Sequence, residues 1–215
     1  MGKDLMKNNP YSIITIFEET VADYCAAPYA IAVDNATNGL FLCMKYLKIE
    51  EEEITIPART FMSVPCAIIH AGNKLIFNKS HPSIQGKKLK GEYKLEPFPI
   101  WDSALTFTKG MYKPGQFQCL SFSGPHKYLK CGKGGMILTD NKKAYEWFKR
   151  AVYFGRRPVD HLVEKFDMLG WNYYMLPEIA AKGAVLMLGM ADNNEDLEIE
   201  YQDLSQYKIY TEGNK

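Results

Sequence analysis

The segment DNATNG (34–39) follows an apolar run and offers small polar residues that could start a helix. At a helix start, the backbone N–H groups of Ala36, Thr37 and Asn38, together with the Thr37 hydroxyl, could bind an anion such as phosphate. An ordinary helix cap explains the same residues without any ligand. On its own, this segment indicates no more than a candidate anion site.

Two further segments place chemically useful side chains directly after apolar runs. Phe61 in PARTFMS (57–63) could stack on a flat ligand, although a place in the core explains an aromatic residue equally well. Asp102 follows the apolar run of IWDSA (100–104), and a carboxylate buried there needs a partner because an unpaired buried charge is costly. A protonated ring nitrogen, an arginine or a helix start could provide that partner.

The segment SFSGPHKYLKCGKGG (121–135) is a basic, glycine-rich turn after another apolar run. It begins with Ser121 and contains Lys127, Lys130 and Lys133. A solvated surface turn explains any one of these lysines, and a phosphate cradle is the alternative. The GxxxxGK[ST] pattern is absent because no Ser or Thr follows the glycines.

Together the four segments offer the groups that pyridoxal 5'-phosphate (PLP) requires. Its phosphate needs N–H and hydroxyl donors, and its ring needs a stacking surface. Its pyridine nitrogen needs a carboxylate that keeps it protonated, and its aldehyde needs a lysine amine. The combination therefore predicts PLP as the cofactor.

Composition limits the function classes that these groups could serve. The chain has 215 residues, of which 47% are hydrophobic, so it can bury one sizeable core. A net charge of +1 gives no global field for binding nucleic acid or a membrane surface. The five cysteines include no CxxC pair and no nearby histidine at metal-ligand spacing, so we expect reduced thiols in a cytoplasmic protein and no metal site. The N-terminus has no apolar signal region, no myristoylation pattern is present and no run is long enough to span a membrane.

Helix and strand patterns alternate along the chain. The patterns predict helices at 12–25, 35–48, 59–72 (after a short turn), 141–154 and 177–190, and strands at 28–35, 53–57, 74–77, 99–101, 117–122 and 136–140. This alternation predicts an α/β fold with a mostly parallel sheet flanked by helices, in which ligands gather at the strand ends. The polar residues 78–98 predict a surface connection, and the last 25 residues predict a helix or a frayed tail.

In order and spacing, these segments resemble the DegT/DnrJ/EryC1/StrS family of sugar aminotransferases, which are PLP enzymes of the aspartate aminotransferase-like fold (fold type I). The resemblance runs from about Tyr29 to Met190. VDNATNGLFLCMKYL is similar to the family's Ser-Gly-Thr-Ala-Ala-Leu phosphate turn, and ITIPARTFMS to its Pro-x-x-Thr-Phe/Trp segment. IWDSA is similar to Glu-Asp-Ala-Ala, and SFSGPHKYLKCGKGG to Ser-Phe, Lys and Gly-Glu-Gly-Gly. GWNYYMLPEIAAKGAVL resembles Gly-Tyr-Asn-Tyr-Arg-Met and the helix after it.

The resemblance implies a role for each matching residue. Lys127 is expected to form the internal aldimine, and Asp102 to hold the pyridine nitrogen. The cofactor-binding residues implied are Ala36, Thr37, Asn38, Phe61, Asp102, Ser121, Lys127 and Asn172. Asn172 is expected to reach the cofactor phosphate of the partner subunit in a homodimer with a shared active site. The implied reaction transfers an amino group from an amino donor to a keto sugar, which is expected to be nucleotide-linked.

The sequence also departs from the family pattern. Leu105 stands where family members usually carry His or Gln, and Lys133 replaces the Glu of Gly-Glu-Gly-Gly. We therefore expect residues 1–190 to form a reduced PLP-binding large domain, with residues 191–215 as a tail or helix remnant in place of the small C-terminal domain.

Two other functions stay open. One is a PLP-fold protein with reduced or lost catalysis that acts as a binding or partner subunit. The other is a phosphate-ligand or RNA-binding module that uses the lysines at positions 127, 130, 133, 142 and 143. The chain has no RNP-like or helix-turn-helix pattern, so we expect no nucleic-acid partner.

Overall fold

The structure is a computed structural model that describes residue 9 and residues 11–160 and 162–211. Residues 1–8, where the sequence predicts neither an export signal nor a lipid anchor, lie outside the described residues. No helix within the described part of the chain combines the length and the hydrophobicity needed to cross a membrane.

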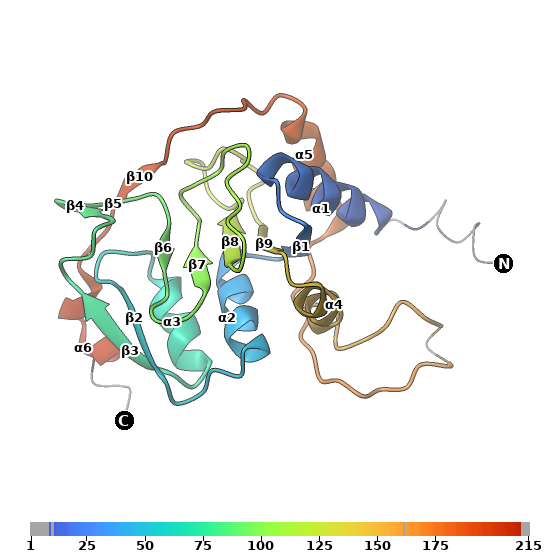
Figure 1. Ribbon diagram of the computed structural model, residues 1–215, viewed down its shortest axis with the longest axis horizontal. Coiled ribbons are helices and arrows are strands. Elements are labelled where there is room, and N and C mark those ends of the chain that lie inside the picture. Colours follow the sequence, from blue (N-terminus) through green and yellow to red (C-terminus); the bar gives the residue numbers. More distant parts are fainter. Residues whose placement is uncertain (1–8, 10, 161, 212–215) are drawn as a thin grey trace.

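Among the described residues, one five-stranded sheet forms the centre of the fold (Figure 1). Its order is β1 (Tyr29–Val33), β9 (Gly135–Thr139), β8 (Phe117–Ser121), β7 (Ile100–Asp102) and β6 (Tyr93–Lys94). A separate parallel pair consists of β2 (Glu53–Pro57) and β3 (Lys74–Asn78). Two backbone hydrogen bonds between Thr55 and Glu96, of 2.9 and 3.1 Å, connect this pair to the sheet beyond β6.

The predicted α/β class is confirmed, but the sheet is mixed and the prediction of a mostly parallel sheet is wrong. β7 and β8 are parallel, whereas β1 with β9, β9 with β8, and β7 with β6 are antiparallel. The reason is the connections: β6 to β7 and β8 to β9 are joined by turns without a crossover helix, and an antiparallel pair needs none. β1, β2, β7 and β8 nevertheless run in the same direction, so their carboxyl ends meet at one edge.

Helices cover both faces of the sheet. They are α1 (Ser12–Cys25), α2 (Ala36–Tyr46), α3 (Ser63–His70), α4 (Lys142–Ala151) and α5 (Pro177–Met187). α2, α3 and α4 bury their apolar faces with Ile31 and Ile137, whereas α1 and α5 pack with Ala30 and Met136 from the opposite face. Because successive strand residues point to opposite faces, β1 and β9 contribute to both cores.

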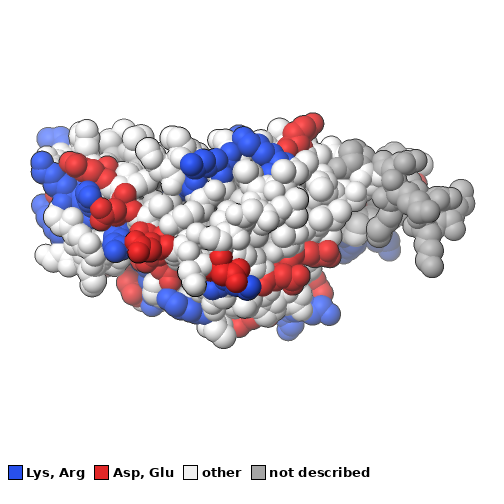
Figure 2. Space-filling model, turned by 90° about the horizontal axis from the view of Figure 1, so that it is seen from above, with Lys and Arg blue, Asp and Glu red and all other residues white. Residues whose placement is uncertain are grey.

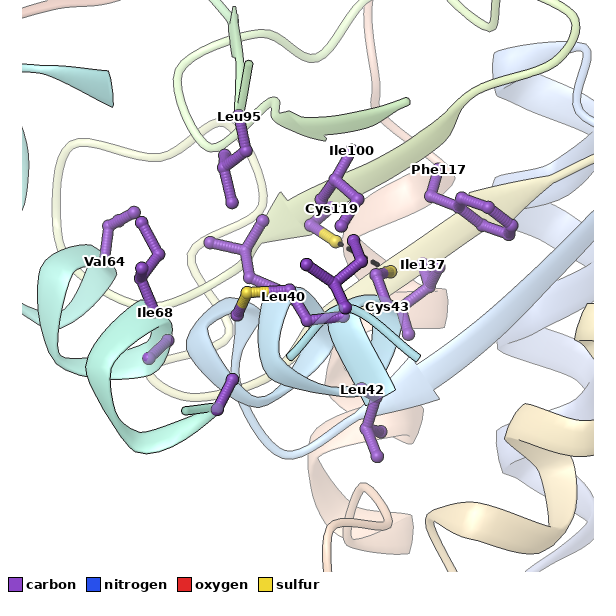
Figure 3. Packing of buried hydrophobic residues seen from close by; sticks show 14 of the residues in the cluster. Leu40, Leu42, Cys43, Val64, Ile68, Leu95, Ile100, Phe117, Cys119 and Ile137 are labelled. Carbon is purple, nitrogen blue, oxygen red and sulfur yellow. Dashed lines mark hydrogen bonds between the residues drawn. The ribbon is translucent and has the colours of Figure 1, made fainter. Parts of the chain in front are cut away.

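The core on the α2 side holds the helix that carries the predicted anion site. Leu40 and Cys43 of α2 pack close to Cys119 and Ile137 of the sheet (Figure 3). The thiols of Cys43 and Cys119 are buried and lie 3.8 Å apart. This packing fixes α2 on the sheet and so fixes the position of its first turn.

Residues 78–98 are more than the predicted surface connection. They contain β4 (Ile84–Gln85), β5 (Lys88–Lys90) and β6, and their side chains Leu89, Tyr93 and Leu95 are buried. The prediction failed because the buried residues alternate with lysines and glutamates, which leaves no continuous apolar run. These residues form one wall of the site described below.

The C-terminal residues, predicted as a helix or a frayed tail, contain a strand as well as a short helix. Residues 191–206, called the strap here, run from α5 across the molecule to β10 (Glu198–Glu200) and a 3-10 turn (Leu204–Gln206), followed by α6 (Lys208–Thr211) (Figure 1). β10 pairs antiparallel with β5, so that Glu198 faces Lys90, Ile199 faces Leu89 and Glu200 faces Lys88. Two opposite charge pairs thus flank one apolar pair, which favours this register.

Basic and acidic side chains alternate over the molecular face that contains this pairing. Figure 2 shows them interspersed, most densely at the end where β4, β5 and β10 lie in Figure 1. The Lys88 amine lies 2.5 Å from the Glu198 carboxylate at this end. The face seen in Figure 2 carries no extended field of one sign.

Candidate active site

A cavity of about 420 Å³ opens at the sheet edge where β1, β2, β7 and β8 end. Its volume lies within the usual range for small-molecule sites. Six residues predicted from the sequence line it: Ala36, Thr37, Phe61, Asp102, Ser121 and Lys127. The structure therefore brings together groups from all four of the segments predicted from the sequence. Asn38 and Asn172 lie outside the lining.

The first turn of α2 forms one end of the cavity. The first N–H groups of a helix have no acceptor within it, and here they belong to Ala36 and Thr37. The Asn35 side chain caps the helix by accepting the Asn38 N–H at 2.8 Å, and the Thr37 hydroxyl lies 2.6 Å from that of Ser63. This end can hold an anion, because the helix start also carries partial positive charge.

Asn38 does not line the cavity, but its hydrogen bonds stabilise the start of α2. Its side-chain amide donates to the Asp34 carboxylate at 2.8 Å, and its backbone N–H is held by Asn35. Burial raises the pKa of Asp34, while the Asn38 hydrogen bond and the positive charge of Lys133 oppose that shift. The predicted direct contact of Asn38 with a ligand stays a prediction.

A glycine permits the close approach between this helix start and the sheet. A Cβ atom at Gly135, the first residue of β9, would lie 2.6 Å from the Ala36 nitrogen and 2.7 Å from the Leu120 carbonyl oxygen. Any larger residue would push the helix start away from the end of β8, where Ser121 stands. The last glycine of GKGG is therefore required by packing at the anion end.

Asp102 lies at the end of β7, almost completely buried. One carboxylate oxygen accepts the Tyr93 hydroxyl at 2.8 Å, and the other accepts the Ala104 backbone N–H at 3.0 Å. Burial raises the pKa of Asp102, and these two hydrogen bonds and the Lys127 charge act in the opposite direction. The cavity thus holds a carboxylate whose oxygens are fixed in orientation.

Lys127 projects from the turn after β8 into the same cavity. Its amine donates to the Ala104 carbonyl at 2.5 Å, in the peptide segment that also binds Asp102. Burial lowers the pKa of Lys127, and the negative charge of Asp102 partly offsets this. Lys130 lies in an outer groove, beside Glu198 and Glu200 of the strap. Of the three lysines in this turn, Lys127 therefore lines the cavity, and Lys130 and Lys133 do not.

The strap covers the cavity opposite the helix start. Ile199 and Tyr201 line it, and the strap is anchored by the Leu197 N–H donating to the Leu105 carbonyl (2.8 Å) and by Arg59 donating to the Tyr201 carbonyl (2.6 Å). The Tyr201 ring meets the Phe61 ring edge-on, with centroids 6.3 Å apart. Leu105 forms a buried apolar part of the wall.

Several cavity residues were not predicted from the sequence. Leu89 and Tyr93 come from the stretch taken as a surface connection, and Ile199 and Tyr201 come from the strap. The available signal was the complementarity of KLK at 88–90 and EIE at 198–200. In each segment an apolar residue lies between two residues of like charge, and the charges of the two segments are opposite in sign. Three-residue patterns so far apart are hard to distinguish from ordinary surface composition.

Asn172 lies on a different part of the molecule. It is exposed, and its backbone bridges to Tyr153. The nearby loop carries strongly exposed apolar side chains, among them Leu162, Phe166 and Leu169. This loop extends away from the body of the molecule in Figure 1.

Helix N–H donors, a fixed carboxylate, an amine of lowered pKa and an aromatic ring surround one cavity in an α/β fold of the PLP-transferase type. The chain belongs to the DegT/DnrJ/EryC1/StrS aminotransferase family, whose model matches residues 5–84 and 108–202. The unmatched residues 85–107 contain both Tyr93 and Asp102. No curated protein matches the chain.

Solved structures share the fold at low sequence identity. AtS13 from Actinomadura melliaura is 19% identical, with a TM-score of 0.68 over 82% of this chain and 59% of its own. Helicobacter pylori PseC, an aminotransferase involved in the biosynthesis of pseudoaminic acid, is 13% identical, with a TM-score of 0.66 over 82% of this chain and 57% of its own. NtdA from Bacillus subtilis, solved with bound cofactor PMP, is 20% identical, with a TM-score of 0.64 over 81% of this chain and 47% of its own. The chain thus spans about half the length of these proteins.

Proposed function

We propose that this protein binds PLP in the cavity and transfers an amino group from an amino donor to a keto sugar, in the cytoplasm. The observation that carries the proposal is the convergence of the Lys127 amine, the Asp102 carboxylate and the start of α2 on one cavity. Membership of the aminotransferase family supports the reaction class. A nucleotide-linked sugar is the substrate class that the resemblance favours.

The residues around the cavity fit PLP in chemistry and in number. The N–H groups of Ala36 and Thr37 and the Ser121 hydroxyl are donors for a phosphate. Asp102 is a carboxylate that can hold a proton on a ring nitrogen, and Phe61, half-exposed at the cavity wall, can stack on a ring. When bound, PLP supplies an electron sink that stabilises negative charge on the reacting carbon.

Lys127 has the properties of a proton carrier in this chemistry. A buried amine with a lowered pKa is neutral more often than an exposed lysine, so it can act as a nucleophile and can accept a proton at its Nζ. The Asp102 carboxylate nearby can stabilise a positively charged group in the cavity. Its own orientation is fixed, because Tyr93 and Ala104 donate hydrogen bonds to its oxygens. The strap residues Ile199 and Tyr201 exclude water from this side of the cavity.

A homodimer with a shared site is part of the proposal. Asn172 is exposed, as a residue acting on a partner subunit must be. The adjacent loop presents Leu162, Phe166 and Leu169 at 82%, 76% and 93% exposure. An ion pair between Arg150 of α4 and Asp167 connects this loop to the helix, and an ion pair between Arg156 and Glu164 lies within the loop. An anchored loop with exposed apolar side chains suits contact with a second copy of the chain.

Borohydride reduction of the protein mixed with PLP tests the proposal. We expect a visible absorption band and, after reduction and digestion, a mass increase on the peptide that contains Lys127. Lys130→Ala is the matched control, because Lys130 lies in the same turn but outside the cavity, and it should label like the wild type. Labelling of Lys127→Ala to the wild-type level would contradict the assignment.

A PLP-binding partner subunit with reduced catalysis is the second candidate. The apolar Leu105 in the cavity wall favours it, because a polar contact to cofactor or substrate is missing there. Incubation of the PLP-loaded protein with glutamate separates the two. Conversion of the cofactor to its amine form supports the aminotransferase, and retention of the aldehyde form supports the partner subunit.

A further inference from the structure

Three side chains from three separate segments form a buried hydrogen-bonded row in the wall of the cavity. The Tyr93 hydroxyl lies 2.8 Å from the Asp102 carboxylate and 2.6 Å from the Thr60 hydroxyl. Tyr93 and Thr60 are each 1% exposed, and Asp102 is 6% exposed. Water is therefore a poor substitute for any member of the row.

The number of protons that each group can donate sets the direction of the hydrogen bonds in this row. An ionised carboxylate can only accept hydrogen bonds, and a tyrosine hydroxyl has one proton to donate. Tyr93 therefore donates to Asp102, and Thr60 must donate to the Tyr93 oxygen. The row runs Thr60 to Tyr93 to Asp102, and each donor strengthens the next bond toward the carboxylate.

The fold holds Tyr93 in place independently of any ligand. Tyr93 on β6 and Asp102 on β7 are directly opposite in the antiparallel register, so their side chains emerge on the same side of the sheet. The His81 ring contacts the Tyr93 ring edge-on, with centroids 6.1 Å apart. Thr60 follows β2 and is fully buried, which fixes its hydroxyl beside Tyr93.

We propose that Tyr93, supported by Thr60, is a positioning residue that holds the Asp102 carboxylate ionised and correctly oriented toward the cavity. The proposal rests on the proposed function, in which Asp102 meets the ring nitrogen of PLP. Tyr93 and Asp102 both lie in residues 85–107, which the family model leaves unmatched, so the proposal is argued from this chain's own β6 and β7.

The other groups around Asp102 affect its charge in known directions. Lys127 from the turn after β8 lowers the pKa of Asp102, and burial raises it. Tyr201 of the strap and Cys119 of β8 also face it, and the Asp102 charge raises the pKa of both. Burial also raises the pKa of Tyr93, so its hydroxyl remains a donor wherever the protein is folded. Among these groups, Tyr93 provides the side-chain hydrogen bond that favours the ionised carboxylate.

Infrared titration of the cofactor-free protein tests the proposal. The carbonyl stretch of the protonated Asp102 carboxyl is followed with pH and assigned by its absence in Asp102→Asn. A hydrogen bond to a charged group typically contributes enough to shift a carboxyl midpoint by about one pH unit, so Tyr93→Phe should raise the midpoint by about that amount. An unchanged midpoint in Tyr93→Phe would overturn the proposal.

Variants of the neighbours provide the controls. Thr60→Val should shift the midpoint in the same direction by less, and Thr60→Ser, which keeps the hydroxyl, should restore the wild-type value. This pair decides the question if Tyr93→Phe does not fold, and equal midpoints in Thr60→Val and the wild type would then overturn the proposal. Tyr112→Phe removes a hydroxyl that donates to the Gln116 carbonyl at 3.0 Å, away from Asp102, and should leave the midpoint unchanged.

PLP titration of the same variants separates failure of this proposal from failure of the proposed function. If the wild type binds PLP and Tyr93→Phe has the wild-type carboxyl midpoint, the positioning role is wrong and the function stands. If the midpoint shifts as expected but the wild type does not bind PLP, Tyr93 holds the carboxylate and the proposed function is wrong.

Discussion

The two ends of the cavity are built from different kinds of sequence. The anion end combines the start of α2 with the end of β8, and each is a short local motif. The opposite side combines β5 and β6 with the strap, and Lys88 and Glu198, which pair there, are 110 residues apart. The first end depends on a close backbone approach that tolerates no extra atom. The second depends on several modest interactions between distant segments.

Among the variants that test this comparison, we expect Gly135→Ala at the anion end to have the largest effect on stability. The added methyl group would lie within 2.8 Å of three backbone atoms that cannot move independently, including those of Asn35 and Leu120. We expect a loss of about 3 kcal/mol in the free energy of unfolding, measured by urea denaturation, because overpacking of rigid neighbours costs roughly this much. Inorganic phosphate should also lose any stabilising effect on the folded protein.

Gly189→Ala provides the matched control for this variant. No atom lies within 4 Å of a Cβ at Gly189, so its free energy of unfolding should stay within about 0.5 kcal/mol of the wild type. Equal stabilities of Gly135→Ala and Gly189→Ala would show that the helix start can shift, and the described contrast between the ends would be wrong.

The same contrast explains which features could be predicted from the sequence. The positions of Ala36, Thr37, Ser121 and Lys127 at a strand end followed by a turn are local properties, and the structure places all four at the cavity. Tyr93 was missed because its role depends on the pairing of β6 with β7.

Long-range pairing also explains the errors in the fold. The mostly parallel sheet was inferred from strand and helix alternation, but β9 returns antiparallel between β1 and β8 after a turn. The strap was missed because EIE has no apolar run of its own. Its Ile199 becomes part of a core only when Leu89 lies opposite. Such pairings are set by the whole fold rather than by any one window of sequence.

A second prediction concerns the stability cost of the Asp102 charge. Burial raises the pKa of Asp102 above its ordinary value of 3.8, so the folded state binds a proton more tightly than the unfolded state. Its contribution to stability is therefore fully present below pH 3.8 and is lost as the pH rises through the folded-state pKa. Each unit of pKa difference is worth about 1.4 kcal/mol.

Asp102→Asn should remove this pH dependence. Urea unfolding of the wild type and the variant between acidic and neutral pH should show the variant gaining in relative stability as the pH rises, and then levelling off. Glu18 and Asp34, whose pKa values are also raised, are present in both proteins and cancel in the difference. A difference that does not change with pH would mean that the Asp102 pKa is not raised, and the carboxylate would then cost no more than an exposed one.

The smallest effect is expected at the strap. Reversing Glu198 and Glu200 to lysine places like charges opposite Lys88 and Lys90 in the β5 and β10 register. These side chains are well exposed, so water and salt screen them and global stability should change little. Local opening of the strap should increase, because like charges directly opposite destabilise a strand pair.

Hydrogen exchange measures this opening directly. The amides of Gly91 and Tyr201, which bond to the Leu197 and Lys87 carbonyls across the pair, should exchange several-fold faster in the reversed variant at low salt. The Gly39 amide in α2, at the anion end, should exchange at the wild-type rate. Reversing Lys88 and Lys90 to glutamate in the same protein restores opposite charges and should restore slow exchange. Faster exchange at Gly39 as well would mean that the strap and the anion end open as one unit, and that the two sides of the cavity are not independent.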